Sequence, residues 1–204
     1  MPGRPAGTLA VMSRHPLTRL AMLLAAVPLL ATWLAAPAYA DSERARDVKG
    51  DVTRLDTSTQ TFTKRPGNKV LDVVRASGKH AKGKITLTVT PRKLSGGEFF
   101  ATWHLKRSNG AMRYVYFSQR ANGSRSVELT TTSFDKVKCK VRSSVNAKKR
   151  IIKAVVPRTC LGKPDWIRYS AGLGQYNGSY IDGDDARIKA RGKGDLFGKK
   201  LRHN

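Results

Sequence analysis

The stretch Lys84-Ile85-Thr86-Leu87-Thr88-Val89-Thr90 alternates strictly between polar and apolar side chains. Successive side chains of an extended strand point to opposite faces, so the aliphatic residues share one face and the threonines share the other. This pattern predicts a strand with one buried face and one wet face. Such strands are typical of antiparallel sheets that pack against a single core.

Similar runs continue on both sides of this stretch. Turn-forming segments such as Ser95-Gly96-Gly97, Ser108-Asn109-Gly110 and Asn122-Gly123 separate them at intervals of about 8–12 residues. The predicted strands are Val70–Arg75, Lys84–Thr90, Phe99–Leu105, Met112–Ser118, Ser126–Thr131, Val137–Val145, Ile151–Val156 and Trp166–Ala171. We therefore predict an all-β fold, an antiparallel two-sheet β-sandwich of about eight strands over residues 53–188.

Residues 1–40 are predicted to be a signal peptide. Arg4, Arg14 and Arg19 form a positive segment, residues 20–36 form an apolar run, and Ala38-Tyr39-Ala40 has the pattern of a cleavage site. An uncleaved membrane anchor is the alternative, but the apolar run only reaches the lower end of the about 17–25 residues that span a membrane. We expect a secreted protein, extracellular or retained at the cell envelope, with no transmembrane segment in the mature chain.

The segments that flank the predicted sandwich are polar. Residues 41–52 form a short polar N-terminal segment, and residues 189–204 form a basic tail in which Asp195 is the only acidic residue. Neither segment offers many apolar side chains for burial. We expect both to be flexible.

The charge of the chain is strongly unbalanced. It has 39 Lys and Arg residues against 14 Asp and Glu, for a formal net charge of +25, and its 40% of hydrophobic residues is too high for a disordered polybasic protein. A positive field attracts polyanions. We expect an anionic envelope polymer or another extracellular polyanion as partner, and nucleic acid only non-specifically. Diffuse charge that serves only solubility is the alternative.

One region concentrates the basic residues. Between Asp135 and Asp165 the sequence has no acidic residue, and basic side chains alternate there with Val137, Cys139 and Val141. The predicted polyanion-binding residues are Lys136, Lys138, Lys140, Arg142, Lys148, Lys149, Arg150 and Lys153. In a strand, the alternating ones project from the face opposite the core. A sheet edge made basic to prevent aggregation is the alternative interpretation.

Cys139 and Cys160 are the only cysteines. An even number of cysteines in an exported protein predicts a disulfide bond, because the compartment is oxidising. The runs Val137–Val145 and Arg150–Val156 lie between them and predict a hairpin whose open end this bond closes.

The segment Pro157-Arg158-Thr159-Cys160-Leu161-Gly162-Lys163-Pro164-Asp165-Trp166 follows the second predicted strand of that hairpin. It resembles the Pro-Arg-x-Cys-Leu-Gly-x-Pro-x-Trp segment of small exported actinobacterial proteins, in which a paired cysteine lies upstream and Asp-Asp-Ala follows. The counterparts here are Cys139 and Asp184-Asp185-Ala186. The resemblance implies a secreted β-sandwich and no assigned activity. This chain departs from the group in being rich in lysine and in its longer basic tail.

Motifs typical of enzymes are absent from the sequence after residue 40. His80, His104 and His203 stand apart from one another, and there is no Gly-x-Ser-x-Gly, His-x-x-x-His or Cys-x-x-Cys. We therefore predict no catalytic residues and place His104 on the surface. An uncharacterised enzyme stays an alternative, because catalytic carboxylates such as Glu98 and Glu128 would be paired by distance in space.

An acidic cluster contrasts with the basic composition. Asp182, Asp184 and Asp185 surround Gly183 and could supply oxygen ligands to a structural Ca²⁺, the one cofactor that we consider. A turn in which these carboxylates cap backbone amides is the alternative.

Tyr176 and Tyr180 lie in a segment rich in Gly and Asn, where exposed rings could stack on sugars. Tyr114, Tyr116 and Tyr169 occur within strand-like runs and are interpreted as core residues. The sequence therefore predicts a secreted, non-catalytic protein that binds polyanions. A neutral-glycan-binding module that uses exposed Tyr and Trp is the alternative.

Overall fold

The computed structural model describes residues 40–94, 96–186 and 197–203. The predicted signal peptide, apart from Ala40, lies outside the described residues. So do residues 189–196 and 204 of the predicted tail.

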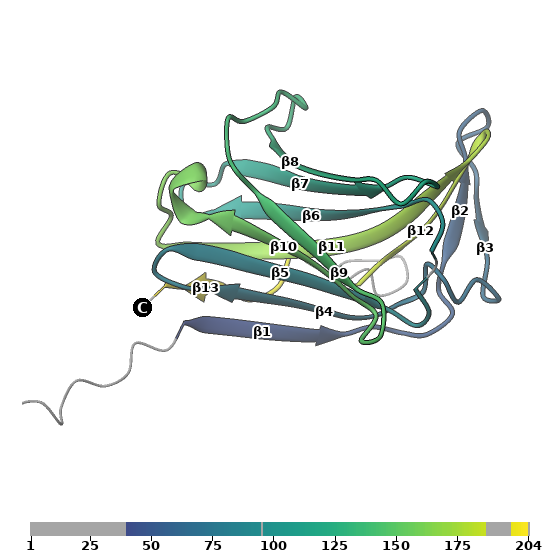
Figure 1. Cartoon of the computed structure of the whole chain (residues 1–204), viewed down its shortest axis with the longest axis horizontal. Coiled ribbons are helices and arrows are strands. Elements are labelled where there is room, and N and C mark those ends of the chain that lie inside the picture. Colours follow the sequence, from purple (N-terminus) through teal and green to yellow (C-terminus); the bar gives the residue numbers. More distant parts are fainter. Residues whose placement is uncertain (1–39, 95, 187–196, 204) are drawn as a thin grey trace, which may run out of the picture. The chain divides into compact units, whose positions relative to one another are not determined.

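The described chain forms two antiparallel sheets, which confirms the predicted two-sheet β-sandwich (Figure 1). The five-stranded sheet has the order β1 (Asp41–Arg46), β4 (Val73–His80), β5 (Lys84–Pro91), β10 (Ile151–Pro157), β9 (Arg142–Asn146). The eight-stranded sheet has the order β3 (Phe62–Lys64), β2 (Thr53–Asp56), β12 (Tyr180–Asp185), β11 (Trp166–Asn177), β6 (Phe99–Arg107), β7 (Met112–Gln119), β8 (Arg125–Thr130) and includes β13 (Leu201–Arg202), which pairs with β11. A 3-10 turn, η2 (Arg158–Leu161), follows β10.

The core lies between the inner faces of the two sheets. Ile85, Leu87 and Val89 of β5 are fully buried, as their alternation predicts. Trp103 and Tyr169 are the largest fully buried side chains of the facing sheet. The apolar members of each strand therefore form one shared interior, and the polar members are left on two outer faces.

The first predicted strand is displaced along the chain. It is expected at Val70–Arg75, but β4 begins at Val73 and runs on through Gly78 to His80. Gly78 is buried in mid-strand, where a Cβ atom would lie 2.6 Å from Cε1 of Tyr169. Glycine is required here for close packing of the two sheets and not for a turn.

The predicted strand Val137–Val145 is only partly formed. Its C-terminal part is β9, and residues 136–141 instead cross from β8 in one sheet to β9 in the other (Figure 1). The chain leaves one sheet before it reaches the other, so these residues have no continuous strand partner. Alternating burial persists along the crossover: Val137, Cys139 and Val141 pack against the core.

The segment predicted to be flexible before residue 53 contains an edge strand. Residues Asp41–Arg46 pair with β4 as β1. Leu201 is fully buried in β13, and Lys199 Nζ lies 3.1 Å from Asp41 Oδ1. The sandwich therefore begins at Asp41 and includes residues of the predicted tail. These strands were missed because they are short or because charged residues hide their alternation.

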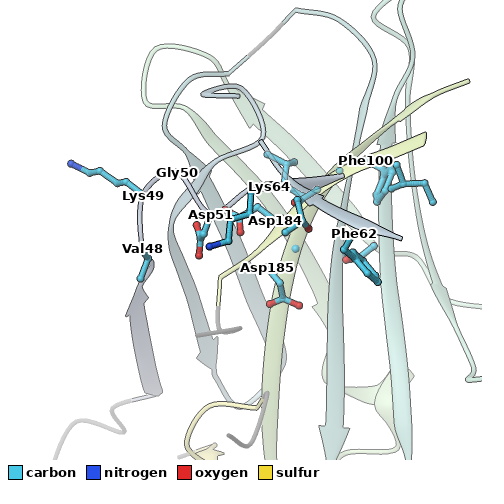
Figure 2. A pocket seen from close by; sticks show the side chains of 16 residues that line it. Val48, Lys49, Gly50, Asp51, Phe62, Lys64, Phe100, Asp184 and Asp185 are labelled. Atoms are coloured by element: carbon cyan, nitrogen blue, oxygen red, sulfur yellow. The ribbon is translucent and has the colours of Figure 1, made fainter. Parts of the chain in front are cut away.

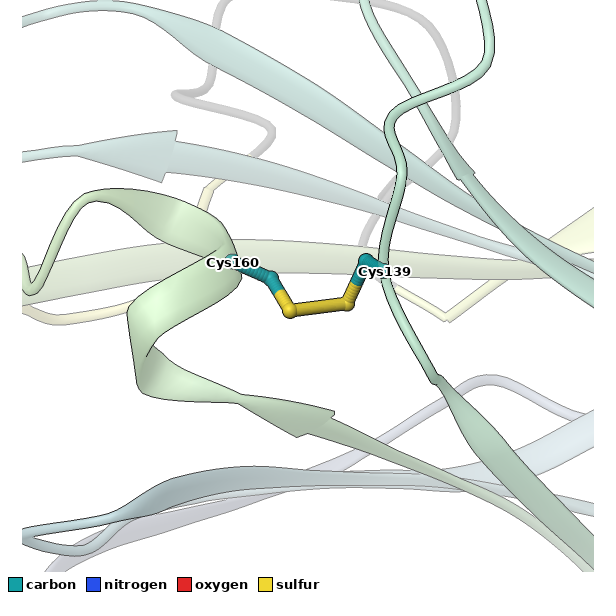
Figure 3. Close-up of a disulfide and its surroundings, with 2 residues drawn as sticks. All are labelled: Cys139 and Cys160. Carbon is teal, nitrogen blue, oxygen red and sulfur yellow. A yellow bond between two sulfur atoms is a disulfide. The ribbon is translucent and has the colours of Figure 1, made fainter.

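The predicted disulfide is present between Cys139 and Cys160, with Cα atoms 5.8 Å apart (Figure 3). It joins the crossover to η2 just beyond the open end of the hairpin that β9 and β10 form, as the sequence predicts. The bond therefore holds the crossover against the end of β10.

Replacing both cysteines by serine should lower the free energy of unfolding by about 3 kcal/mol, the chain-entropy value for a closed loop of this length. Urea titration of the parent and the double variant measures this loss, and the reduced parent protein should match the variant. Equal stability of the oxidised parent and the variant would contradict the stabilising role.

Candidate functional site

The outer face of the five-stranded sheet is uniform in the chemistry of its side chains. Residues that are partners in adjacent antiparallel strands point to the same face. One such row crosses all five strands: Arg44, Ser77, Thr88, Lys153 and Ser144. Every side chain in this row is basic or carries a hydroxyl group.

The neighbouring rows have the same character. The outward basic residues of these five strands are Arg44, Arg46, Arg75, Lys79, Lys84, Arg142 and Lys153, and we call this surface the basic face. Its other members are Ser, Thr and Asn with Ile151, Val155 and Pro157, and no outward residue of the five strands is acidic. Hydroxyl groups also pair across it, since Ser77 Oγ and Thr88 Oγ1 are 2.6 Å apart.

The structure brings part of the predicted basic set onto this face. Arg142 and Lys153 belong to it. The other predicted residues lie outside this face, on the crossover or in the turn between β9 and β10, and all are exposed: Lys136, Lys138, Lys140, Lys148, Lys149 and Arg150. Lys136 pairs with Thr130 of β8, so it lies at the edge of the eight-stranded sheet. Lys136 forms an ion pair with Glu128, with Nζ 3.4 Å from Oε2. Arg150 donates a hydrogen bond to the Arg92 carbonyl.

The sequence interpretation missed the half of the basic face that comes from β1 and β4. Arg44 and Arg46 are two residues apart, as are Ser77 and Lys79, so each pair projects from one side of its strand. This spacing of two is visible in the sequence, but it indicates a shared face only when both segments are known to be strands.

The three carboxylates predicted as a calcium site do not converge. Asp182 and Asp184 lie on one face of β12, and Asp185 lies on the other. Asp182 is bound by Arg54, with Oδ2 2.7 Å from an Nη atom. Asp184 accepts a hydrogen bond of 2.7 Å from the Val73 amide. The predicted ligand set is therefore wrong, because strand alternation separates its members.

Asp184 instead meets acidic residues from the segment between β1 and β2. One carboxylate oxygen from each of Asp47, Asp51 and Asp184 lies within 4.8 Å of the others, so these three side chains could together hold a cation. Asp47 Oδ2 and Asp51 Oδ1 are buried and have no hydrogen-bond partner in the described part of the chain. Nearby, the fully buried Asp72 accepts a hydrogen bond of 3.1 Å from Gly50.

Burial makes these carboxyl groups hold their protons. Desolvation, followed by repulsion from Asp184, raises the pKa of Asp47 to about 8. Desolvation also raises the pKa of Asp184 to about 7, and it raises the pKa of Asp51. The cluster is therefore less negative at neutral pH than three carboxyl groups would otherwise be.

We predict that Asp47 and Asp184 lower the stability of the metal-free protein as pH rises from about 4 to 8. Their folded-state pKa values lie above the unfolded values of about 3.9, so these two groups bind more protons in the folded state throughout this window. Burial lowers the pKa values of His80 and His104, which contribute in the opposite direction, so the test compares variants. In EDTA, Asp47→Asn should gain melting temperature relative to the parent protein as pH rises from about 4 to 8. Asp165→Asn, at an exposed position, is the matched control. The same pH dependence in Asp47→Asn and in the parent protein would contradict this assignment.

Calcium binding can be tested at the cluster of Asp47, Asp51 and Asp184. At about pH 8 the ionised carboxylates repel one another, and a divalent cation would offset the repulsion. If calcium binds here, it raises the melting temperature of the parent protein at this pH and not that of Asp184→Asn. Equal melting temperatures in calcium and in EDTA would contradict a calcium site.

The two tyrosines predicted to stack on sugars lie on opposite faces of the hairpin formed by β11 and β12. Tyr176 is on the outer face of the eight-stranded sheet, 5.0 Å from Phe100 between ring centroids. Tyr180 packs under the Arg54 guanidinium at 4.9 Å. They do not form one platform.

Other aromatic residues share the outer face with Tyr176. Tyr116, interpreted from sequence as core, lies there with its ring centroid 5.7 Å from that of Phe100. Tyr114 is also outward and packs at 4.7 Å on His104, which is on the surface face as predicted. Tyr169 is in the core, as expected.

A scan against models of known protein families gives no match, and a search of curated proteins finds no relative with significant sequence similarity. In the described ranges, no helix has the length and apolar character needed to cross a membrane.

Proposed function

We propose that this chain is a secreted, non-catalytic binding protein that engages an anionic polymer of the cell envelope or extracellular space through the basic face. One observation carries the proposal: strand register collects seven basic side chains and no acidic one on the outer side of the five-stranded sheet. The disulfide supports export, because such bonds persist in oxidising compartments.

The spacing of the basic face suits a polymer with closely repeated negative charges. Outward side chains on one strand are roughly 6.5–7 Å apart, and neighbouring strands are about 4.8 Å apart. Both distances are shorter than the Debye length of about 8 Å at physiological salt, so the cations repel one another when no ligand is bound. A polyanion would relieve this repulsion and release its own counterions.

Protection against aggregation does not explain this arrangement. That role places lysines on edge strands, which in this sheet are β1 and β9. Arg75 and Lys79 lie on β4, and Lys153 lies on β10. Each of these strands has a neighbour on both sides. Their basic residues face outward from the middle of the sheet, where there is no edge to protect.

Replacing Arg75, Lys79 and Lys153 together by Gln should clearly reduce the salt concentration that elutes the protein from immobilised polyphosphate. All three side chains point away from the core, so the fold should be preserved, as a circular dichroism melt will show. A second triple variant, Lys138→Gln with Lys140→Gln and Lys149→Gln, measures the contribution of the crossover and the turn.

The matched control replaces Arg65, Lys106 and Arg120 by Gln, which removes the same charge outside the five-stranded sheet. It should elute close to the parent protein. An equal decrease in the control and in the variant of β4 and β10 would show that diffuse net charge causes retention. No retention of the parent protein would overturn the proposal.

A further inference from the structure

We infer that the eight-stranded sheet carries a second, independent site for a neutral polysaccharide chain. The site is a cavity of about 890 Å³ on the outer side of this sheet, near the ends of β2, β3, β6, β11 and β12. This volume falls within the range of roughly 300–1,000 Å³ typical of ligand pockets. It is large enough for more than one sugar ring.

The floor of the cavity is made by glycines. Gly174 is the partner of Phe100 on one side and of Gly183 on the other, and Gly183 is in turn the partner of Thr53. The missing side chain at Gly174 makes room for the Phe100 ring, and the missing side chain at Gly183 leaves the backbone of β12 open to a ligand.

Aromatic rings border this floor. The ring of Phe100 lies over Gly174, since a Cβ atom there would be 2.4 Å from Phe100 Cζ. Phe100 is also in contact with the rings of Tyr116 and Tyr176, at 5.7 and 5.0 Å between centroids. Phe62 lines the cavity and is 55% exposed, and Tyr176, which lies beside Phe100 just outside the lining, is 54% exposed. A ligand in the cavity can therefore cover the exposed Phe62 ring and reach the edge of this aromatic group.

Polar groups of both signs complete the lining. Figure 2 shows the Phe62 and Phe100 rings on one side of the view and Asp51 on the other, with Lys64 and Asp184 between them. Thr53 and Thr102 add hydroxyl groups. This mixture contrasts with the basic face, where no outward residue is acidic, and it does not favour a polyanion.

These features together match the chemistry of a sugar ring. A pyranose has an apolar C–H face that packs on aromatic rings and a rim of hydroxyl groups that exchange hydrogen bonds with carboxylates, hydroxyls and amines. An apolar ligand would leave the polar lining unsatisfied, at a cost in binding free energy. A neutral glycan chain would pack on the aromatic rings and form hydrogen bonds with the polar side chains of the cavity.

Affinity electrophoresis in gels that contain soluble cellulose derivative, β-1,3-glucan, xylan or glycol chitin tests the inference. The parent protein should be retarded by at least one of these polymers, and the retardation should persist at about 0.5 M salt. Phe62→Ala should weaken binding about tenfold, as expected for the loss of one ring contact. Gly174→Val should also weaken it, because the new side chain displaces the Phe100 ring.

Phe134→Ala is the matched control, because Phe134 is 76% exposed and does not line the cavity. It should bind like the parent protein, and so should the Gln variant of Arg75, Lys79 and Lys153, which separates this site from the basic face. Melting temperatures identify variants that fail to fold, and Phe62→Ala, at an exposed position, decides the case if Gly174→Val unfolds. The inference is overturned by no retardation in any of the four polymers, by retardation that salt abolishes, or by unchanged binding of Phe62→Ala.

Discussion

Strand register is the constraint on which the rest of this structure depends. Because side chains alternate with a period of two, a slip of one residue in β5 would exchange buried Leu87 for Thr88. The two sheets are also fixed against each other, since the Tyr169 ring fills the space that a side chain at Gly78 would occupy. The same constraint that fills the core therefore decides which side chains are collected on each outer face.

The two outer faces differ in their chemistry. The five strands of the smaller sheet present basic side chains and hydroxyl groups on their outer face, and none of their outward side chains is acidic. On the eight-stranded sheet, aromatic rings lie beside groups of both signs. Several of the few acidic residues are gathered around Asp47 and Asp184, where burial raises their pKa values. Asp47 borders the basic face beside Arg46 and Arg75, but its raised pKa limits the negative charge that it brings there.

The fold class could be predicted from sequence because strands such as Lys84–Thr90 combine aliphatic and threonine residues in strict alternation. Strand β1 could not, because its inward side chains are Asp41, Glu43 and Ala45, which give no apolar alternation, so that it is recognised only from its pairing with β4. Only part of each candidate site could be predicted, because strand pairing brings together residues that are far apart in the sequence. Lys140 and Arg142 are two residues apart in the sequence, whereas Arg44 and Lys153 come into one row only through the pairing of β1, β4, β5 and β10. Tyr116 has the same sequence pattern whether its ring faces the core or solvent.

The central claim is that anionic polymers lie on one face of the sandwich. Lysine acetylation in the presence and absence of polyphosphate, followed by peptide mass spectrometry, tests it most directly, because each lysine reports on its own surroundings. Polyphosphate should protect Lys79, Lys84 and Lys153 strongly, and should leave Lys64, Lys106 and Lys163 as reactive as in the unbound protein. Protection spread evenly over all six lysines, or confined to the second group, would contradict the claim.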